Sequence, residues 1–248
     1  MNRALGCYYE KVYKGSKDSC MDILKEKIDS GTSQFVVTAN PEIFMMGKRL
    51  PEMDSLLTND NTLIVPDGIG IIRGGELLGY HFRERIPGVE ICQSLLEYAD
   101  QKHKSLYLFG AEQKVLDALV RRIEKEYSGI VLCGSTDGYV GDRDKVFRKI
   151  ISLEPDIVLI ALGTPAQELL INKYFQSSQK GIYIGVGGSF DVLSGMKKRA
   201  PSIFIKYNLE WLYRITTEPK RLKRFWDSNV KFLFELRKEK NERTRKNK

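Results

Sequence analysis

Short runs of β-branched and aliphatic residues recur along this 248-residue chain, and each is followed by a turn residue and then a helical pattern. The runs are 34–38, 62–65, 105–109, 129–132, 156–162 and 181–186. Between them, 89–101 and 113–127 carry apolar residues at the 3.6-residue spacing of an amphipathic helix. Strands that are apolar throughout and alternate with helices are typical of a parallel sheet with helices on both faces. We therefore predict an α/β, Rossmann-like fold with a mostly parallel sheet.

The residues that directly follow these runs are rich in Gly, Pro, Asn and Asp. In a parallel sheet, ligands bind outside the carboxyl ends of the strands, so we expect these residues at the binding site. Gly lets the backbone approach a ligand closely, and exposed helix N-termini favour a diphosphate. Any one of these loops is also consistent with an ordinary turn. Together, at one edge of the sheet, they favour a single pocket that binds a nucleotide.

The chain changes character at about Pro201, after which helical patterns continue without strand patterns. Residues 220–248 contain 12 Lys and Arg against 4 Asp and Glu, so this segment carries the whole net charge of +8. On a helical wheel, one side collects Leu222, Phe225, Trp226, Val230, Leu233 and Leu236. A cationic amphipathic helix suits an anionic membrane surface, and the alternative is an ordinary helix packed on the domain. We predict a Rossmann-like domain over 1–200 and a helical, basic, membrane-docking appendage over 201–248.

The sequence also limits location and cofactors. No segment has the uninterrupted apolar length of a bilayer-spanning helix, and 1–13 lacks the apolar core of a secretory signal. We therefore expect a cytoplasmic protein that contacts the inner face of the membrane peripherally. The 4 Cys are widely spaced without a CxxC pair, and the 2 His have no zinc-ligand spacing. We expect no metal and no cofactor.

Two other classes of protein share part of this pattern. A nicotinamide-dependent oxidoreductase would need GxGxxG in its first strand-to-helix turn, and this chain has TANP at 38–41 instead. A nucleic-acid-binding protein could use the basic segment. However, the preceding residues are neutral overall and show no helix-turn-helix, RRM or zinc pattern. We therefore expect no nucleic-acid partner.

Eight short motifs, taken in order, resemble those of the WecG/TagA/CpsF family of bacterial glycosyltransferases, glycosyltransferase family 26. They are TANPE (38–42), PDGIG (66–70), ERIPG (84–88), LFG (108–110), GTPAQE (163–168), GVGGSFD (185–191), RAP (199–201) and LEWLYR (209–214) with EPKR (218–221). The resemblance implies an inverting, metal-independent transferase. In the best-known branch, the donor is UDP-N-acetylmannosamine and the acceptor is undecaprenyl-diphosphate-linked N-acetylglucosamine, in wall teichoic acid synthesis. Other branches make capsule or related polysaccharides from donors such as UDP-N-acetylmannosaminuronate or UDP-glucose.

Asp67 is our predicted catalytic base. An inverting transfer needs a base for the acceptor hydroxyl, and a carboxylate just after a strand suits that role. The resemblance points to the same Asp, and the alternative is a cap for a helix that begins near Ile69. We predict that Arg85 neutralises the diphosphate as its bond to the sugar breaks, although Arg83 offers the same planar fork.

Seven further residues of the first domain are predicted to bind the substrates. They are Thr38, Asn40, Gly110, Gln167, Gly187, Gly188 and Asp191. Thr38 and Asn40 offer a hydroxyl and an amide to sugar hydroxyls, or order their own loop as an Asx-type turn. Gln167 stands near the start of a helix, so its amide is expected to face a ligand at that N-terminus.

The last of these loops has two interpretations. Gly187 and Gly188 fit a phosphate-binding loop or merely a tight turn. Asp191 fits a contact to the ribose or base of a nucleotide, or a helix cap.

The segment Asp142-Arg143-Asp144 spells DxD, the metal-diphosphate signature of other glycosyltransferases. It opens a helical pattern, where capping and the helix dipole favour acidic residues. We therefore interpret Asp142 and Asp144 as helix-start residues rather than metal ligands.

The resemblance also assigns a role to three arginines of the appendage. It implies that Arg214, Arg221 and Arg224 complete the site over the donor diphosphate when the appendage folds down at the membrane. It implies as well that the protein self-associates in solution.

Overall fold

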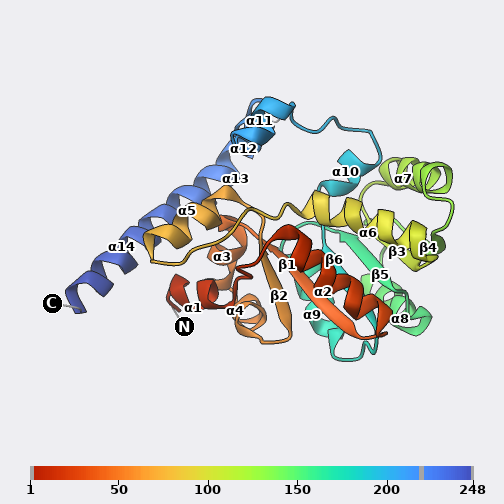
Figure 1. Ribbon diagram of the computed structural model, residues 1–248, viewed down its shortest axis with the longest axis horizontal. Helices are drawn as coiled ribbons and strands as arrows, with labels where there is room; N and C mark the ends of the chain where they lie inside the picture. Colours follow the sequence, from red (N-terminus) through yellow and green to blue (C-terminus); the bar gives the residue numbers. More distant parts are fainter. Residues whose placement is uncertain (1–2, 218–220, 247–248) are drawn as a thin grey trace.

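The computed structural model describes residues 3–217 and 221–246. Six strands form one sheet in the order β2-β1-β6-β5-β3-β4, and every neighbouring pair is parallel. The strands are β1 (Ser33–Ala39), β2 (Thr62–Pro66), β3 (Ser105–Gly110), β4 (Val131–Thr136), β5 (Ile157–Ala161) and β6 (Gly181–Gly185). Helices cover both faces of this sheet (Figure 1). The predicted α/β, Rossmann-like architecture is confirmed.

Two apolar cores lie on opposite faces of the sheet, because successive side chains of a strand point to opposite sides. In β1, for example, Val36 belongs to one core and Phe35 and Val37 to the other. The first core is covered by α2 (Lys17–Asp29), α6 (Gly88–Lys102), α7 (Gln113–Glu126) and α10 (Ser189–Leu193). The second is covered by α1 (Leu5–Lys11), α3 (Pro41–Gly47), α4 (Pro51–Thr58), α5 (Ile69–Leu77), α8 (Arg143–Leu153) and α9 (Ala166–Phe175). The amphipathic patterns at 89–101 and 113–127 correspond to α6 and α7.

Strand β4 differs from its prediction. It runs from Val131 to Thr136 rather than over 129–132, so Cys133, Gly134 and Ser135 lie within the strand and not in a loop after it. β4 is the edge strand and is largely accessible, and its register against β3 shifts between Leu106 and Tyr107. An accessible edge strand needs no continuous apolar run, which explains why the apolar pattern placed it too early.

A crevice forms where β1 and β6 lie side by side. The chain leaves β1 into α3, which packs on the second core, and leaves β6 into α10, which packs on the first. Two adjacent strands therefore lead to opposite faces of the sheet at their carboxyl ends. Such a topological switch point is where ligands bind in open α/β sheets.

The C-terminal segment is helical, as predicted. It consists of α11 (Ser202–Lys206), α12 (Glu210–Thr217), α13 (Arg221–Phe225), the π-helix η1 (Trp226–Val230) and α14 (Lys231–Lys246). Figure 1 shows α14 running beside α5 toward the C-terminus. Across residues 3–217 and 221–246, no helix combines the length and the apolar character needed to cross a membrane.

Helix α14 packs on the Rossmann-like domain along one side. Phe232 and Leu236 are 1% and 0% exposed and belong to the second core. The carboxylate of Glu239 accepts hydrogen bonds from the backbone N–H groups of Leu5 (2.7 Å) and Gly6 (3.1 Å), at the start of α1. The packed-helix alternative therefore describes this side of α14.

The helical wheel was wrong about which residues share a side. Leu236 is buried, whereas Leu222, Trp226 and Leu233 are exposed together with Phe234. The π-helix at Trp226–Val230 has more residues per turn than an α-helix, so it rotates the residues that follow it relative to Leu222 and Phe225. It does not separate Leu233 from Leu236, because both belong to α14. The exposed apolar side chains remain available for a membrane surface. Whether 201–248 acts as a separate docking domain stays a prediction.

Candidate active site

A cavity of about 710 Å³ lies outside the carboxyl ends of the strands at the switch point. Loops after β1, β2, β3, β5 and β6 line its inner wall. The C-terminal helices supply the outer wall through residues that include Glu210, Trp211, Phe225 and Asn229. Its volume lies within the range of about 300–1,000 Å³ that is usual for small-molecule sites. The loop after the edge strand β4 takes no part in this lining.

Most of the predicted site residues of the first domain line this cavity. They are Thr38, Asn40, Asp67, Arg85, Gln167, Gly187, Gly188 and Asp191. Gly110 is the exception, although its neighbour Ala111 lines the cavity. Gly110 has φ +121°, and a Cβ there would lie 2.4 Å from the carbonyl oxygen of Ala161. Gly110 therefore allows β3 and β5 to end close together.

Asp67 directly follows β2. Its backbone N–H donates to the carbonyl of Ala39 (3.0 Å), which fixes the turn against the end of β1. The N-cap of α5 is Gly68, which has no side chain to cap that helix. Asp67 therefore does not hold the N-cap position, and its carboxylate belongs to the wall of the cavity.

Arg85 and Glu210 form an ion pair in the cavity wall. Nη2 of Arg85 lies 2.7 Å from Oε2 of Glu210, and the two side chains are only 16% and 10% exposed. Arg83, by contrast, is exposed and is not among the lining residues. The geometry therefore favours Arg85 over Arg83 as the residue that faces a ligand.

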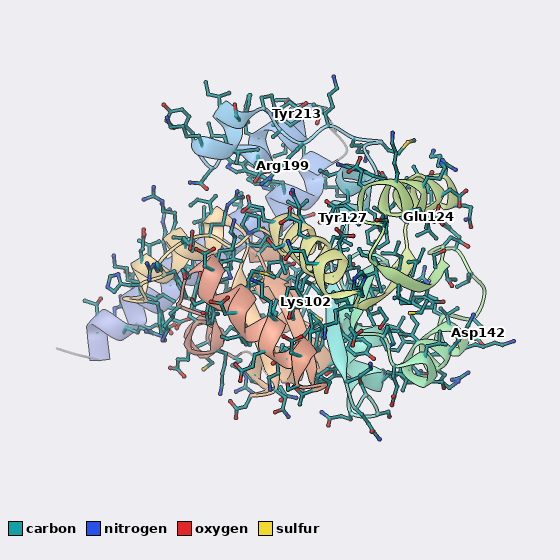
Figure 2. All side chains as sticks on the ribbon, turned by 45° about the vertical axis from the view of Figure 1, so that its right-hand side comes forward. Lys102, Glu124, Tyr127, Asp142, Arg199 and Tyr213 are labelled. Atoms are coloured by element: carbon teal, nitrogen blue, oxygen red, sulfur yellow. The ribbon has the colours of Figure 1, made fainter. Side chains whose placement is uncertain are left out.

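Glu210 also connects the C-terminal helices to the first domain. Its Oε1 lies 3.5 Å from Nε of Arg199, whose Nη2 donates to Glu90 of α6 (2.7 Å). Figure 2 shows Arg199 beside the C-terminal helices. Burial alone would raise the pKa of Glu90, but hydrogen bonds from Arg199 and Lys17 lower it below its ordinary value. The outer wall is thus attached to the inner wall by a line of paired charges.

Gln167 ties together the loops that follow β5 and β6. Its Oε1 accepts from the N–H groups of Gly163 (3.1 Å) and Gly187 (3.2 Å), and its Nε2 donates to Oε1 of Glu168 (2.8 Å). A Cβ at Gly185 would lie 2.6 Å from Nε2 of Gln167, so the glycine makes room for this side chain. Both polar ends of the amide are used within the protein, and the loops they order line the cavity.

The predicted substrate-binding residues at the edges of the cavity show mixed roles. Oδ1 of Asn40 accepts from the N–H of Ile43 (3.0 Å), so the turn-forming interpretation describes that oxygen. Asp191 lies in the first turn of α10, and its carboxylate is 3.4 Å from Nζ of Lys197. The substrate contacts of both residues stay predictions.

The DxD segment lies away from the cavity. Asp142 accepts from the N–H of Lys145 (2.8 Å) and caps α8, as predicted, while Asp144 pairs with Lys173 and Tyr174. Figure 2 shows Asp142 at the edge of the molecule, remote from Arg199. In the part of the chain that the structure describes, no group of three or more His, Cys, Asp or Glu could hold a metal ion.

The three arginines of the appendage can be placed only by their backbones. Arg214 belongs to α12, and Arg221 and Arg224 belong to α13. Their side chains lie outside the described residues. Their predicted role over the diphosphate stays a prediction.

Three features of this site were not predicted from the sequence. Glu168 and Glu210 are buried carboxylates in the cavity wall. Glu168 belongs to the GTPAQE motif and Glu210 to the LEWLYR motif. Trp211 and Phe225 stack with ring centroids 4.8 Å apart in the outer wall. The motifs were the available signal for the two carboxylates. The stacking depends on how α12 and α13 fold together, which residue spacing does not reveal.

Comparison with known proteins defines the class. The profile described as "Glycosyl transferase WecG/TagA/CpsF family" matches residues 7–246. A protein of Bacillus spizizenii is 42% identical over 79% of this chain and 76% of its own length, and one of Bacillus subtilis is 40% identical over 89% and 86%. A Staphylococcus aureus protein is 34% identical over 85% and 82%. All three carry the name N-acetylglucosaminyldiphosphoundecaprenol N-acetyl-beta-D-mannosaminyltransferase. The chain belongs to the WecG/TagA/CpsF family of glycosyltransferases.

Proposed function

We propose that this enzyme transfers N-acetylmannosamine from UDP to undecaprenyl-diphosphate-linked N-acetylglucosamine, with inversion and without a metal. The observation that carries the proposal is the cavity, which brings Asp67 and Arg85 together at the switch point of the sheet. A carboxylate serves as base and a guanidinium as counter-charge, so this site holds the two groups that an inverting transfer requires. The names of the relatives support the choice of sugars and carrier.

The proposed mechanism divides the cavity between the two substrates. The loops around Gly187 and Gly188, ordered by Gln167, hold the donor nucleotide. Asp67 removes the proton from the acceptor hydroxyl as that oxygen attacks the anomeric carbon. Arg85 balances the negative charge that gathers on the departing UDP, the task a metal ion performs in DxD enzymes. Arg214, Arg221 and Arg224 are proposed to add positive charge from the outer wall.

A donor panel tests the chemistry. With a short-chain lipid-diphospho-N-acetylglucosamine acceptor, we expect UDP-N-acetylmannosamine to give a disaccharide lipid at a rate that EDTA does not change. Mass and anomeric configuration of the product are the measurements. If only UDP-N-acetylmannosaminuronate or UDP-glucose served as donor, the family assignment would stand and the proposed donor would be refuted. Complete loss of activity in EDTA would refute metal-independent transfer.

We also propose that the exposed apolar and basic side chains of 201–248 dock the enzyme on an anionic membrane. Trp226 and Phe234 are 63% and 66% exposed. Burying such side chains in the interface stabilises binding by about 1.5–3 kcal/mol each when burial is complete. Basic residues add roughly 1 kcal/mol each near an anionic surface. The acceptor lipid stays in the bilayer, so docking brings its sugar to the cavity.

Replacing Trp226 and Phe234 together by Ser should weaken binding to anionic vesicles roughly 10- to 100-fold, because only part of each side chain enters the interface. Transfer to a membrane-embedded acceptor should fall in parallel, and transfer to a water-soluble short-chain acceptor should persist. Tyr139→Ser is the matched control, since Tyr139 is even more exposed, at 76%, but belongs to the first domain. Unchanged vesicle binding by the double variant would remove these residues from the docking surface.

A further inference from the structure

Glu168 is a buried carboxyl group for which the proposed mechanism has no use. It lies in the first turn of α9, lines the cavity and is only 4% exposed. Its Oε1 accepts two hydrogen bonds, from Nε2 of Gln167 (2.8 Å) and from Oγ1 of Thr164 (3.4 Å). Its Oε2 is covered from solvent and has no partner among the described residues. An unsatisfied buried polar atom is costly, so this oxygen calls for an explanation.

The surroundings of Glu168 favour its neutral form. Burial raises the pKa of this carboxyl above its ordinary value, and the charge of Glu42 on α3 acts in the same direction. Hydrogen bonds from Gln167, from the backbone and from Thr164 act against the rise without cancelling it. Gln167 and Thr164 are uncharged, so among the described residues Glu42 is the charged group that contributes to this shift. A neutral carboxyl carries its proton on Oε2, because Oε1 is occupied as an acceptor.

A neutral Glu168 can offer the cavity one strong hydrogen-bond donor, the Oε2–H group, beside the weaker acceptor capacity that its hydroxyl oxygen keeps. The complementary group is a pure acceptor such as an amide carbonyl, whereas a hydroxyl also presents a donor. Contact with a ligand requires a rotation that turns Oε2 from its covered position toward the cavity, and the terminal torsion of a Glu side chain is broad enough to allow one. The names of the relatives specify two N-acetylated amino sugars, and each has one such carbonyl in its acetamido group.

We propose that Glu168, as a neutral acid, donates a hydrogen bond from Oε2 to the acetamido carbonyl of a bound amino sugar and so selects N-acetylated substrates. This inference rests on the proposed function, since it presumes that an N-acetylamino sugar occupies the cavity. Glu168 is then a specificity-determining residue, distinct in role from the base Asp67. The isosteric amide of Gln can replace a neutral acid here, because its NH₂ donates where Oε2–H donated.

Steady-state kinetics of Glu168→Gln and Glu168→Ala test the proposal. With N-acetylated donor and acceptor, the Ala variant should lose roughly 10- to 100-fold in kcat/KM, the cost of an unmet buried hydrogen bond, mainly through KM. The Gln variant should stay within about threefold of the wild type, as an isosteric donor allows. In the wild type, KM should rise as the pH passes the raised pKa of Glu168, and the Gln variant should lack that rise. Equal losses in both variants would show that an ionised carboxylate is needed and would overturn the proposal.

Sugars that lack the acetamido group identify the contact. UDP-mannose replaces the donor in one series, and lipid-diphospho-glucose replaces the acceptor in the other. In the series that removes the contacted carbonyl, wild type and Glu168→Ala should become equally active. An equal fold-loss for the Ala variant in every series would mark Glu168 as merely structural and refute selection. Failure of the proposed donor would appear in the wild type in the donor panel, whereas failure of this inference appears only in the variants.

Discussion

Replacing Asp67 by Asn is expected to lower kcat by ~10²–10⁴-fold, the range that loss of a general base produces. Asn keeps the shape of the side chain but cannot accept the proton of the acceptor hydroxyl. The turn at Asp67 is fixed by its backbone hydrogen bond to Ala39, which the substitution leaves in place. We therefore expect the thermal unfolding midpoint to change little. Single-turnover transfer to a short-chain acceptor is the measurement, since it isolates the chemical step.

Asp142→Asn is the matched control for this substitution. Asp142 caps α8 at the edge of the molecule, and Asn caps a helix about as well as Asp, so this substitution should change neither stability nor turnover much. If Asp67→Asn turns over almost as fast as the wild type, the base must be another carboxylate, and Asp191 is the next in the cavity wall to replace.

Replacing Arg85 by Ala should lower kcat by ~10²–10³-fold, similar to the loss of one preorganised donor to a developing charge. A Lys at this position should recover only part of the rate, because an ammonium cannot present the planar fork of Arg to a diphosphate. The paired carboxylate of Glu210 keeps a second partner in Arg199, so the variant should remain folded. Stopped assays of UDP release measure the rate, and circular dichroism follows unfolding.

Arg83→Ala separates the specific role of Arg85 from general positive charge. Arg83 is exposed outside the cavity, so its replacement should leave kcat nearly unchanged. A large loss in Arg83→Ala with normal turnover in Arg85→Ala would transfer the diphosphate contact to Arg83. It would also require the segment 81–88 to change conformation when substrate binds, so that Arg83 enters the cavity.

The sequence predicted the sheet well where strands are buried on both faces. Such strands are continuous apolar runs, and β1, β5 and β6 appear within one or two residues of their predicted bounds. The pattern failed at β4, whose edge position leaves it accessible and irregular. It failed again at the C-terminal helices, where a π-helix changes the residue spacing on which a helical wheel depends.

The candidate site was predictable where it follows the strands. Asp67 comes directly after a strand, Gln167 stands at a helix start and Thr38 lies at the carboxyl end of β1, and parallel topology gathers those positions at one edge. The outer wall was not predictable in this way. Glu210 forms an ion pair with Arg85 although the two residues are 125 positions apart in the sequence, and that pairing depends on how the C-terminal helices pack. That Oε2 of Glu168 is buried without a partner among the described residues likewise depends on the packing around it and not on its neighbours in sequence.

The hydrogen bonds between Glu239 and the start of α1 have a consequence for how the protein is made. Leu5 and Gly6 obtain hydrogen-bond partners from a residue 234 and 233 positions later in the chain. A nascent chain emerges amino end first, so Glu239 must be synthesised before the backbone of the first helix can obtain these partners. This contact therefore forms late relative to the synthesis of α1, and a product that ends before Glu239 lacks it.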